Sequence, residues 1–132
     1  MNALCNPKLI FLILSLTIPT SLFAEKYLCI SEQSTGFKYI NNAWTSVNFK
    51  EGAKYMVDLS DRSVGIFGTL DRIHGKCDVI LNYKFDCTND KEGRFQMSIE
   101  NLRYQRTFNL GGFIDNDPYG SPFIEIGSCH KL

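Results

Sequence analysis

After residue 24 the sequence lacks any long hydrophobic run, and its only such run lies near the start. Lys8 precedes the apolar residues 9–18, and small polar residues and Ala24 follow them. This order is typical of a secretory signal peptide, so we expect residues 1–24 to be removed and residues 25–132 to form one domain. About ten apolar residues are half of what a bilayer crossing needs, so we expect no membrane insertion.

Residues 25–132 also lack an excess of charge of either sign. They contain 13 Lys and Arg against 14 Asp and Glu, with no run of like charges. Proteins that bind nucleic acids or anionic membranes usually carry a basic patch or stripe. The sequence therefore predicts no nucleic-acid partner.

Motifs of common catalytic and cofactor sites are missing as well. There is no glycine-rich phosphate loop, His-Glu-x-x-His motif or EF-hand loop. Only His74 and His130 could act as the base for a serine or cysteine nucleophile. His74 falls in the turn-forming segment 71–76, and His130 is the third residue from the end, where chains fray. We expect a protein that is not an enzyme and holds no metal and no cofactor.

No Cys-x-x-Cys pair of the zinc-binding kind occurs. Removal of the signal peptide would also remove Cys5 and leave an even set of four cysteines, Cys29, Cys77, Cys87 and Cys129. An even set in an exported chain indicates two disulfides. We therefore expect the mature protein to be periplasmic or secreted.

The segment CDVILNYKFDC, residues 77–87, is compatible with two structures. Its apolar residues alternate as in a single long strand, which would hold the two cysteines roughly 33 Å apart. A turn at residues 81–83 would instead place Cys77 opposite Cys87. The other segments between turn signals are five to nine residues long, which favours the turn. Cys29 in the first strand and Cys129 in the last would then form the second disulfide.

What the sequence does contain is a regular series of short aromatic and β-branched segments separated by turn formers. This spacing is typical of an all-β fold, and no helical periodicity is present after Ala24. Sequential hairpins without helical crossovers favour an antiparallel meander. We expect it to close into a barrel of about eight strands, tied by disulfides, because closure removes exposed edges. A two-sheet β-sandwich is the alternative.

The clearest hairpin covers residues 94–108. A turn at residues 100 and 101 would place Met97 opposite Tyr104 and Phe95 opposite Arg106 on one face. Arg106 is the polar exception on that face. We expect it at a strand end with its charge in water, the alternative being a cation over Phe95 or lining a cavity.

The polar segment 115–122 offers two interpretations besides a plain turn. Asp115 and Asp117 could give oxygens to calcium, but Asn, Asp, Pro and Gly are also the usual turn formers, which we favour. With Tyr119 beside them, the two acids could instead form a recognition loop. Fifteen of the 108 residues after Ala24 are aromatic, and a small core explains them better than the lining of a ligand cavity.

Two resemblances add to these patterns. The Tyr-x-Cys start at residues 27–29 and the Pro-aromatic-Ile-Glu-Ile-Gly-x-Cys end at residues 122–129 resemble a group of small exported bacterial proteins, some phage-associated, without assigned activity. More loosely, Thr35, Gly36 and Tyr39 form a Thr-Gly-x-x-Tyr motif similar to the Ser-Gly-x-x-Tyr inhibitory loop of periplasmic inhibitors of C-type lysozyme. That similarity implies a small disulfide-linked barrel and an inhibitory site at these three residues.

Together these observations predict an exported binding protein that acts on another protein, such as a cell-wall hydrolase or an envelope component. A rigid barrel would hold segments 31–36 and 115–122 as preformed binding loops. The alternative is a carrier of a small apolar ligand in the mouth of a lipocalin-like barrel.

Overall fold

The computed structural model describes residues 25–89, 93–108, 113–117 and 119–132. The predicted signal peptide, residues 1–24, lies outside them. The described residues form ten strands and no helix. The strands are β1 (Lys26–Ile40), β2 (Ala43–Asn48), β3 (Lys54–Asp58), β4 (Ser63–Ile66), β5 (Arg72–His74), β6 (Cys77–Ile80), β7 (Lys84–Asn89), β8 (Gly93–Ser98), β9 (Arg103–Phe108) and β10 (Phe123–Lys131).

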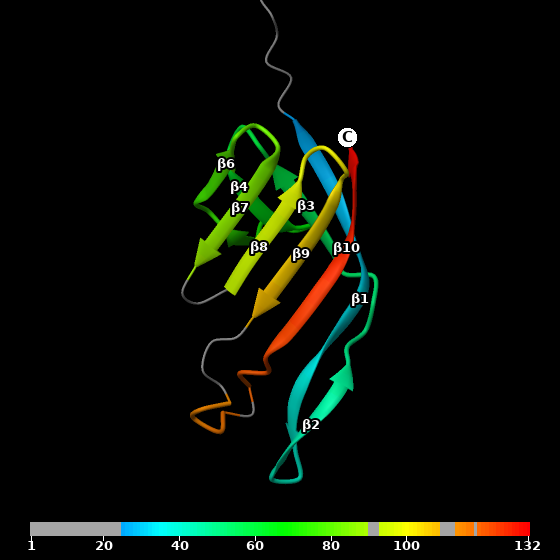
Figure 1. Cartoon of the computed structure of the whole chain (residues 1–132), viewed down its shortest axis with the longest axis vertical. Helices are drawn as coiled ribbons and strands as arrows, with labels where there is room; N and C mark the ends of the chain where they lie inside the picture. Colours follow the sequence, from blue (N-terminus) through cyan, green and yellow to red (C-terminus); the bar gives the residue numbers. More distant parts are fainter. Residues whose placement is uncertain (1–24, 90–92, 109–112, 118) are drawn as a thin grey trace, which may run out of the picture.

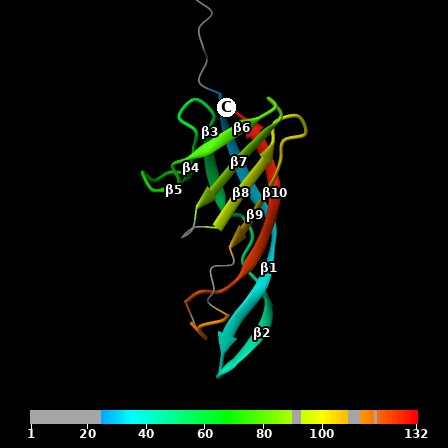
Figure 2. The ribbon, with the colours of Figure 1, turned by 60° about the vertical axis from the view of Figure 1, so that its left-hand side comes forward.

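One antiparallel sheet contains all ten strands and curls almost into a closed barrel (Figures 1 and 2). Nine strands follow one another in the order β5-β4-β3-β1-β10-β9-β8-β7-β6, and β2 pairs with β1 off this path. The two ends of the path, β5 and β6, are separated in the chain only by Gly75 and Lys76. Because every neighbouring pair is antiparallel, β5 and β6 run in the same direction. β5 pairs with β4 and β6 pairs with β7, so the short link between β5 and β6 connects the two edges of the sheet.

This architecture confirms the predicted disulfide-tied meander, with the first strand beside the last, rather than the two-sheet sandwich. The predicted length of the segments was wrong for β1, which has 15 residues. Residues 31–36 were expected to form a turn or loop, but they lie within β1. The pairing with β10 shifts by one residue between Ser31 and Gln33, and the consecutive side chains of Glu32 and Gln33 are both exposed there.

Both disulfides join residues that lie directly opposite each other in neighbouring strands. Cys29 in β1 is bonded to Cys129 in β10, and Cys77 in β6 to Cys87 in β7. The β6–β7 turn has Leu81 and Asn82 at φ 50° and 61°, so the predicted turn is confirmed. Asparagine tolerates this left-handed conformation better than most residues.

The hairpin of β8 and β9 has the predicted register, with Met97 opposite Tyr104 and Phe95 opposite Arg106. Five side chains are almost completely buried inside the barrel: Phe95, Met97, Phe85, Val57 and Val64. Phe95 stacks on Tyr104 with ring centroids 5.0 Å apart. The centre of the barrel is therefore filled by side chains of its own strands.

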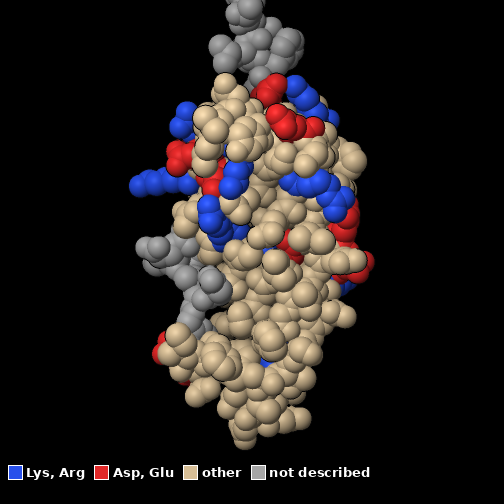
Figure 3. All heavy atoms as spheres, in the orientation of Figure 1, with Lys and Arg blue, Asp and Glu red and all other residues tan. Residues whose placement is uncertain are grey.

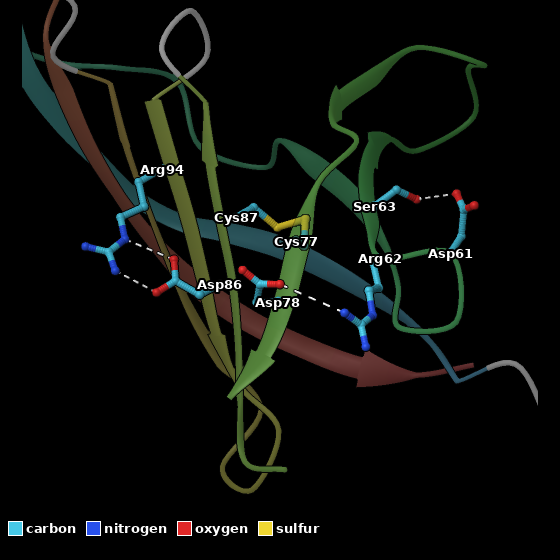
Figure 4. The surroundings of a disulfide bond; sticks show 8 residues. All are labelled: Asp61, Arg62, Ser63, Cys77, Asp78, Asp86, Cys87 and Arg94. Carbon is cyan, nitrogen blue, oxygen red and sulfur yellow. Dashed lines mark hydrogen bonds and ion pairs between the residues drawn. A yellow bond between two sulfur atoms is a disulfide. The ribbon is translucent and has the colours of Figure 1, made fainter. Parts of the chain in front are cut away.

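Outside the barrel wall, Asp86 makes a dense set of contacts next to the Cys77–Cys87 disulfide (Figure 4). It accepts two hydrogen bonds from Arg94, at 3.0 and 2.6 Å, and a third from Gln96 at 2.9 Å. Hydrogen bonding by Arg94 holds the pKa of the Asp86 carboxyl below its usual value. These contacts stabilise the outer face of β7 and β8.

The part of β1 beyond β10 leaves the barrel together with β2 and forms a two-stranded projection, which we call the arm (residues 37–48; Figures 1 and 2). A two-residue turn at Asn41 and Asn42, with φ 51° and 61°, joins its strands. At the base of the arm Gly36 lies against β10, where a Cβ atom would overlap the carbonyl oxygen of Pro122. The lack of a side chain at residue 36 lets β1 and the start of β10 approach each other closely.

Among the described residues, no helix is long and apolar enough to cross a membrane. The two disulfides indicate that the chain folds in an oxidising compartment.

Candidate functional site

The arm and the connection that precedes β10 meet at one end of the barrel. On the arm, Tyr39 packs against Trp44 with ring centroids 5.3 Å apart, and Trp44 packs against Phe113 at 5.6 Å. The Trp44 indole also donates a hydrogen bond of 3.5 Å to Asn116. The arm thereby contacts residues 113–117, which are more than 60 residues away in the chain. We call the arm together with residues 113–117 and 119–122 the arm end.

Thr35 and Gly36 lie in the middle of β1 and are paired on both sides, with β2 and with β10. The Thr35 hydroxyl donates a hydrogen bond to the backbone oxygen of Val47. Residues 35 and 36 therefore lie in a paired strand and not in the free loop that the Thr-Gly-x-x-Tyr motif implied, and their role in inhibition stays a prediction. Thr35 and Gly36 instead line a mainly apolar groove of about 420 Å³ with the half-exposed Phe37.

Asp115, Asp117 and Tyr119 lie on the exposed connection between β9 and β10. Asp117 shapes this connection, because its carboxylate accepts a hydrogen bond of 2.9 Å from the backbone N–H of Tyr119. Tyr119 is 94 % exposed. Within the described ranges, no three acidic, histidine or cysteine side chains are grouped as metal ligands would be.

The arm end differs from the rest of the surface in its charge. In the face shown in Figure 3, Lys, Arg, Asp and Glu gather over the upper half of the molecule. The lower part shows few of them, a small acidic area at its left edge and a small basic spot near its centre. Several large apolar side chains of the arm end are exposed instead: Phe37, Ile40, Phe113, Ile114 and Tyr119.

A pocket of about 340 Å³ lies between the base of the arm and the start of β10, and we call it the mouth pocket. Its lining includes the aromatic residues Phe49, Phe108, Tyr119 and Phe123. Its charged residues are Lys50, Arg106 and Glu125. Phe49 and Phe108 both contact Phe123, with ring centroids 5.9 and 5.8 Å apart. The pocket therefore combines aromatic walls with two cations and one acid.

From the sequence we expected the side chain of Arg106 to extend into water, and this prediction was wrong. Its guanidinium lies 5.4 Å from the ring centre of Tyr55 and 5.2 Å from that of Phe123, and it lines the mouth pocket. The alternative of a cation against an aromatic ring in a cavity is confirmed, although the rings differ from the expected Phe95. Arg106 and the two residues after it at the end of β9 are half-buried.

Glu125 is 4 % exposed and is the acid of a hydrogen-bond network inside the barrel. It accepts hydrogen bonds from the hydroxyls of Tyr104, at 2.9 Å, and Tyr55, at 3.2 Å. Arg106 donates to the same Tyr55 hydroxyl at 3.1 Å. The Tyr55 hydroxyl thus connects the buried carboxylate to the guanidinium.

Burial raises the pKa of Tyr55 to about 12, and the nearby charge of Glu125 acts in the same direction. Burial and Glu125 also raise the pKa of Tyr104. Both phenols therefore stay protonated at neutral pH and remain donors to Glu125. The two tyrosines therefore supply fixed hydrogen bonds to the network.

His74 lies in β5 and is 1 % exposed, so its predicted place in a turn was wrong. Neither of its ring nitrogens has a hydrogen-bond partner among the described residues. Burial, and to a lesser degree the charge of Arg106, lowers its pKa to about 4. A buried neutral imidazole of this kind contributes to packing and lacks the carboxylate that would orient a catalytic base.

Sequence reasoning missed Glu125 and its two tyrosines, although one signal was present. Every second residue of a strand points to the same face of the sheet. Cys129 points inward because it forms a disulfide, so the residues on the same face of its strand also point inward: Phe123, Glu125 and Gly127.

Comparison with models of known protein families, with curated proteins and with solved structures found no match for this chain.

Proposed function

We propose that this protein is an exported binding protein that holds a protein partner at its arm end. The observation that carries the proposal is the meeting of the arm and residues 113–117 through the contact of Trp44 with Phe113. Two segments distant in the sequence form one surface, and this surface has exposed aromatic groups and few charges. Interfaces are enriched in tyrosine and other aromatic residues, and charged residues are depleted at their centres.

Exposure of the apolar groups supports the same conclusion. Phe113 is 62 % exposed, Ile114 is 81 % exposed and Tyr119 is 94 % exposed, and they lie within seven residues of one another. Large apolar side chains gathered on a small surface often mark an interaction site. The pairing of β1 with β2 and with β10 holds the base of this surface rigid, which lowers the entropy lost on binding.

The open edge of β2 extends the surface. Within the part of the chain that the structure describes, β2 pairs with β1 alone, and its sequence, AWTSVN, contains neither charge nor proline. Figures 1 and 2 both show its outer side without a neighbouring strand. Exposed edges are normally protected by charges, prolines or bulges, so an unprotected edge favours pairing with a strand of a partner.

A cell-wall hydrolase is the partner class that the motif at residues 35–39 suggests, and the paired strands of the arm, rather than a free loop, would contact it. An inhibitor of this kind would place Tyr39 and Trp44 against the enzyme, since the arm projects beyond the barrel. An envelope component bound by the same surface is the other form of the proposal.

The carrier of a small apolar ligand is a second candidate, and the mouth pocket is the observation that favours it. Against a lipocalin-like carrier, the interior is filled by Phe85, Phe95 and Met97, each at most 1 % exposed. The space of about 340 Å³ suits a small group near the surface.

The test uses the oxidised chain of residues 25–132 in lysis assays with lysozymes and with envelope-derived hydrolases. We expect inhibition that is lost in Phe113→Ala and Tyr119→Ala. Leu81→Ala is the matched control, because Leu81 is 78 % exposed on the β6–β7 turn, away from the arm end. Unchanged lysis with every enzyme rules out the inhibitor. A periplasmic partner whose capture is equally strong for all three variants rules out the arm end as its binding surface.

A further inference from the structure

We propose that the mouth pocket binds a carboxylate carried on an aromatic group, with Arg106 as the residue that pairs with the carboxylate. This inference goes beyond the proposed function, because it concerns the chemistry of the pocket and holds for a free acid as well as for a group of a protein.

Among the described residues, Arg106 is the arginine of β8 and β9 without a carboxylate partner. Arg94 binds Asp86 through two of its nitrogens, and Arg103 binds Glu32 in the same way, at 3.2 and 3.0 Å. Arg106 instead makes one hydrogen bond to a described residue, the bond to the Tyr55 hydroxyl. Its Nε is enclosed and has no acceptor in the described part of the chain. A guanidinium has five N–H donors, so most of the donors of Arg106 remain available.

Glu125 does not supply the missing acceptor, although it lies directly opposite Arg106 in the pairing of β9 and β10. Its two oxygens already accept hydrogen bonds from Tyr104 and Tyr55. Among the described residues, no ion pair joins Arg106 to an acid. The tyrosines thus hold the carboxylate of Glu125 away from the guanidinium and leave the guanidinium facing the pocket.

The charge of the pocket favours an anion. Arg106 and Lys50 carry two positive charges against the single negative charge of Glu125. Lys50 is exposed at the rim, so it attracts an anion from solution without giving up its own hydration. Arg106 is fixed between the rings of Tyr55 and Phe123, and an arginine oriented in this way can bind both oxygens of a carboxylate at little entropic cost.

The walls determine the rest of the ligand. Phe108 and Phe123 lie nearly parallel, with an interplanar angle of 13°, and Phe49 meets Phe123 from another side at 59°. A flat ring attached to the carboxylate would contact these faces, because aromatic pairs favour offset-stacked and edge-to-face packing. The ligand class is therefore an aromatic carboxylate, either a free aromatic acid or the C-terminal residue of a protein that ends in an aromatic side chain.

The test measures binding of phenylacetate and of the peptide Gly-Gly-Phe to the oxidised chain by NMR titration. Each probe has a neutral counterpart, phenylacetamide and the C-terminal amide of the peptide. We expect the carboxylates to bind about tenfold more tightly than the amides, since a charge-assisted pair is lost in each amide. Shifts should be centred on the backbone amides of Phe49, Arg106 and Phe123.

Arg106→Gln should abolish the preference for the carboxylate, and Arg103→Gln, which breaks the exposed pair with Glu32, should leave it unchanged. Lys50→Gln leaves the interior network untouched, so it tests the charge even if Arg106→Gln disturbs the fold, and we expect weaker binding of both carboxylates. If phenylacetate and the peptide bind with similar affinity, a free aromatic acid is enough to occupy the pocket. If the peptide alone binds, the ligand is the C-terminal residue of a protein. Equal affinity for acids and amides, or no binding of any probe, would overturn the proposal.

Discussion

Removal of the Cys29–Cys129 disulfide should destabilise the protein more than removal of the Cys77–Cys87 disulfide. The four cysteines are all at most 4 % exposed, so their replacement by alanine removes similar packing at both sites. In both pairs the strands are already paired at the cysteines, so the folded structure does not depend on the sulfur bond for its register. The difference between the two variants should therefore arise in the unfolded chain.

The magnitude follows from the lengths of the closed loops. The bonded cysteines are 100 residues apart in one disulfide and 10 in the other. The chain-entropy relation gives about 4.7 kcal/mol for the long loop and about 2.8 kcal/mol for the short one, so the free energies of unfolding should differ by roughly 2 kcal/mol.

The measurement is equilibrium unfolding in urea at 25 °C, followed by far-ultraviolet circular dichroism, for the two double alanine variants and the oxidised parent. The slope of the free energy against urea should also increase more for the variant without Cys29 and Cys129, because its unfolded state exposes more surface. Equal losses for the two variants, or a larger loss without Cys77 and Cys87, would refute an origin in the unfolded chain.

Three further predictions concern the interior and the outer face of the barrel. The unfolded chain takes up a proton at His74 near pH 6.5, and the folded chain does so only near pH 4. The free energy of unfolding should therefore fall by about 3 kcal/mol as the pH is lowered from 6.5 to 4. A variant His74→Leu should show a shallower pH dependence in urea titrations, and an unchanged slope would contradict this assignment. Asp86→Asn should cost about 2 kcal/mol, because Asp86 is 9 % exposed and accepts three hydrogen bonds. Glu32→Gln, at an exposed pair, should cost much less, and equal thermal shifts for the two variants would count against the role of burial. Gly127→Ala should destabilise by at least about 2 kcal/mol, since its Cβ would overlap the Ile30 carbonyl oxygen, whereas Gly75→Ala has free space and serves as the control; similar melting temperatures for these two variants would show that β1 and β10 separate easily.

The sequence was sufficient to predict the all-β barrel, both disulfides and the register of the hairpin from residue 94 to 108. These features depend on local alternation and on turn residues such as Asn82, which act within a few positions of the chain. The disulfide between the ends then followed from closure of the sheet.

Features that depend on long-range packing were beyond the sequence. The polar residues 31–36 look like a loop, but pairing with β10 on one side and with residues 47–54 on the other keeps them in β1. Arg106 looked solvated because its environment comes from Tyr55 and Phe123, on two other strands. Of the candidate site, the alternation could place Glu125 inside the barrel, but it could not show that Tyr55 joins it to Arg106.

The bond between the first and last strands also determines how the molecule would respond to mechanical force. Tyr27 lies opposite Lys131 and Cys29 opposite Cys129, so both ends of the described chain leave the barrel side by side (Figure 1). A pull on the two ends would load the sulfur bond after four residues at the start and three at the end of the described chain, and the barrel beyond it would carry no tension. Reduction of that bond would release the enclosed chain, a gain in length of roughly 340 Å for the 100-residue separation at about 3.4 Å per residue. The arm end lies at the opposite end of the molecule and would keep its shape while the two termini are under load.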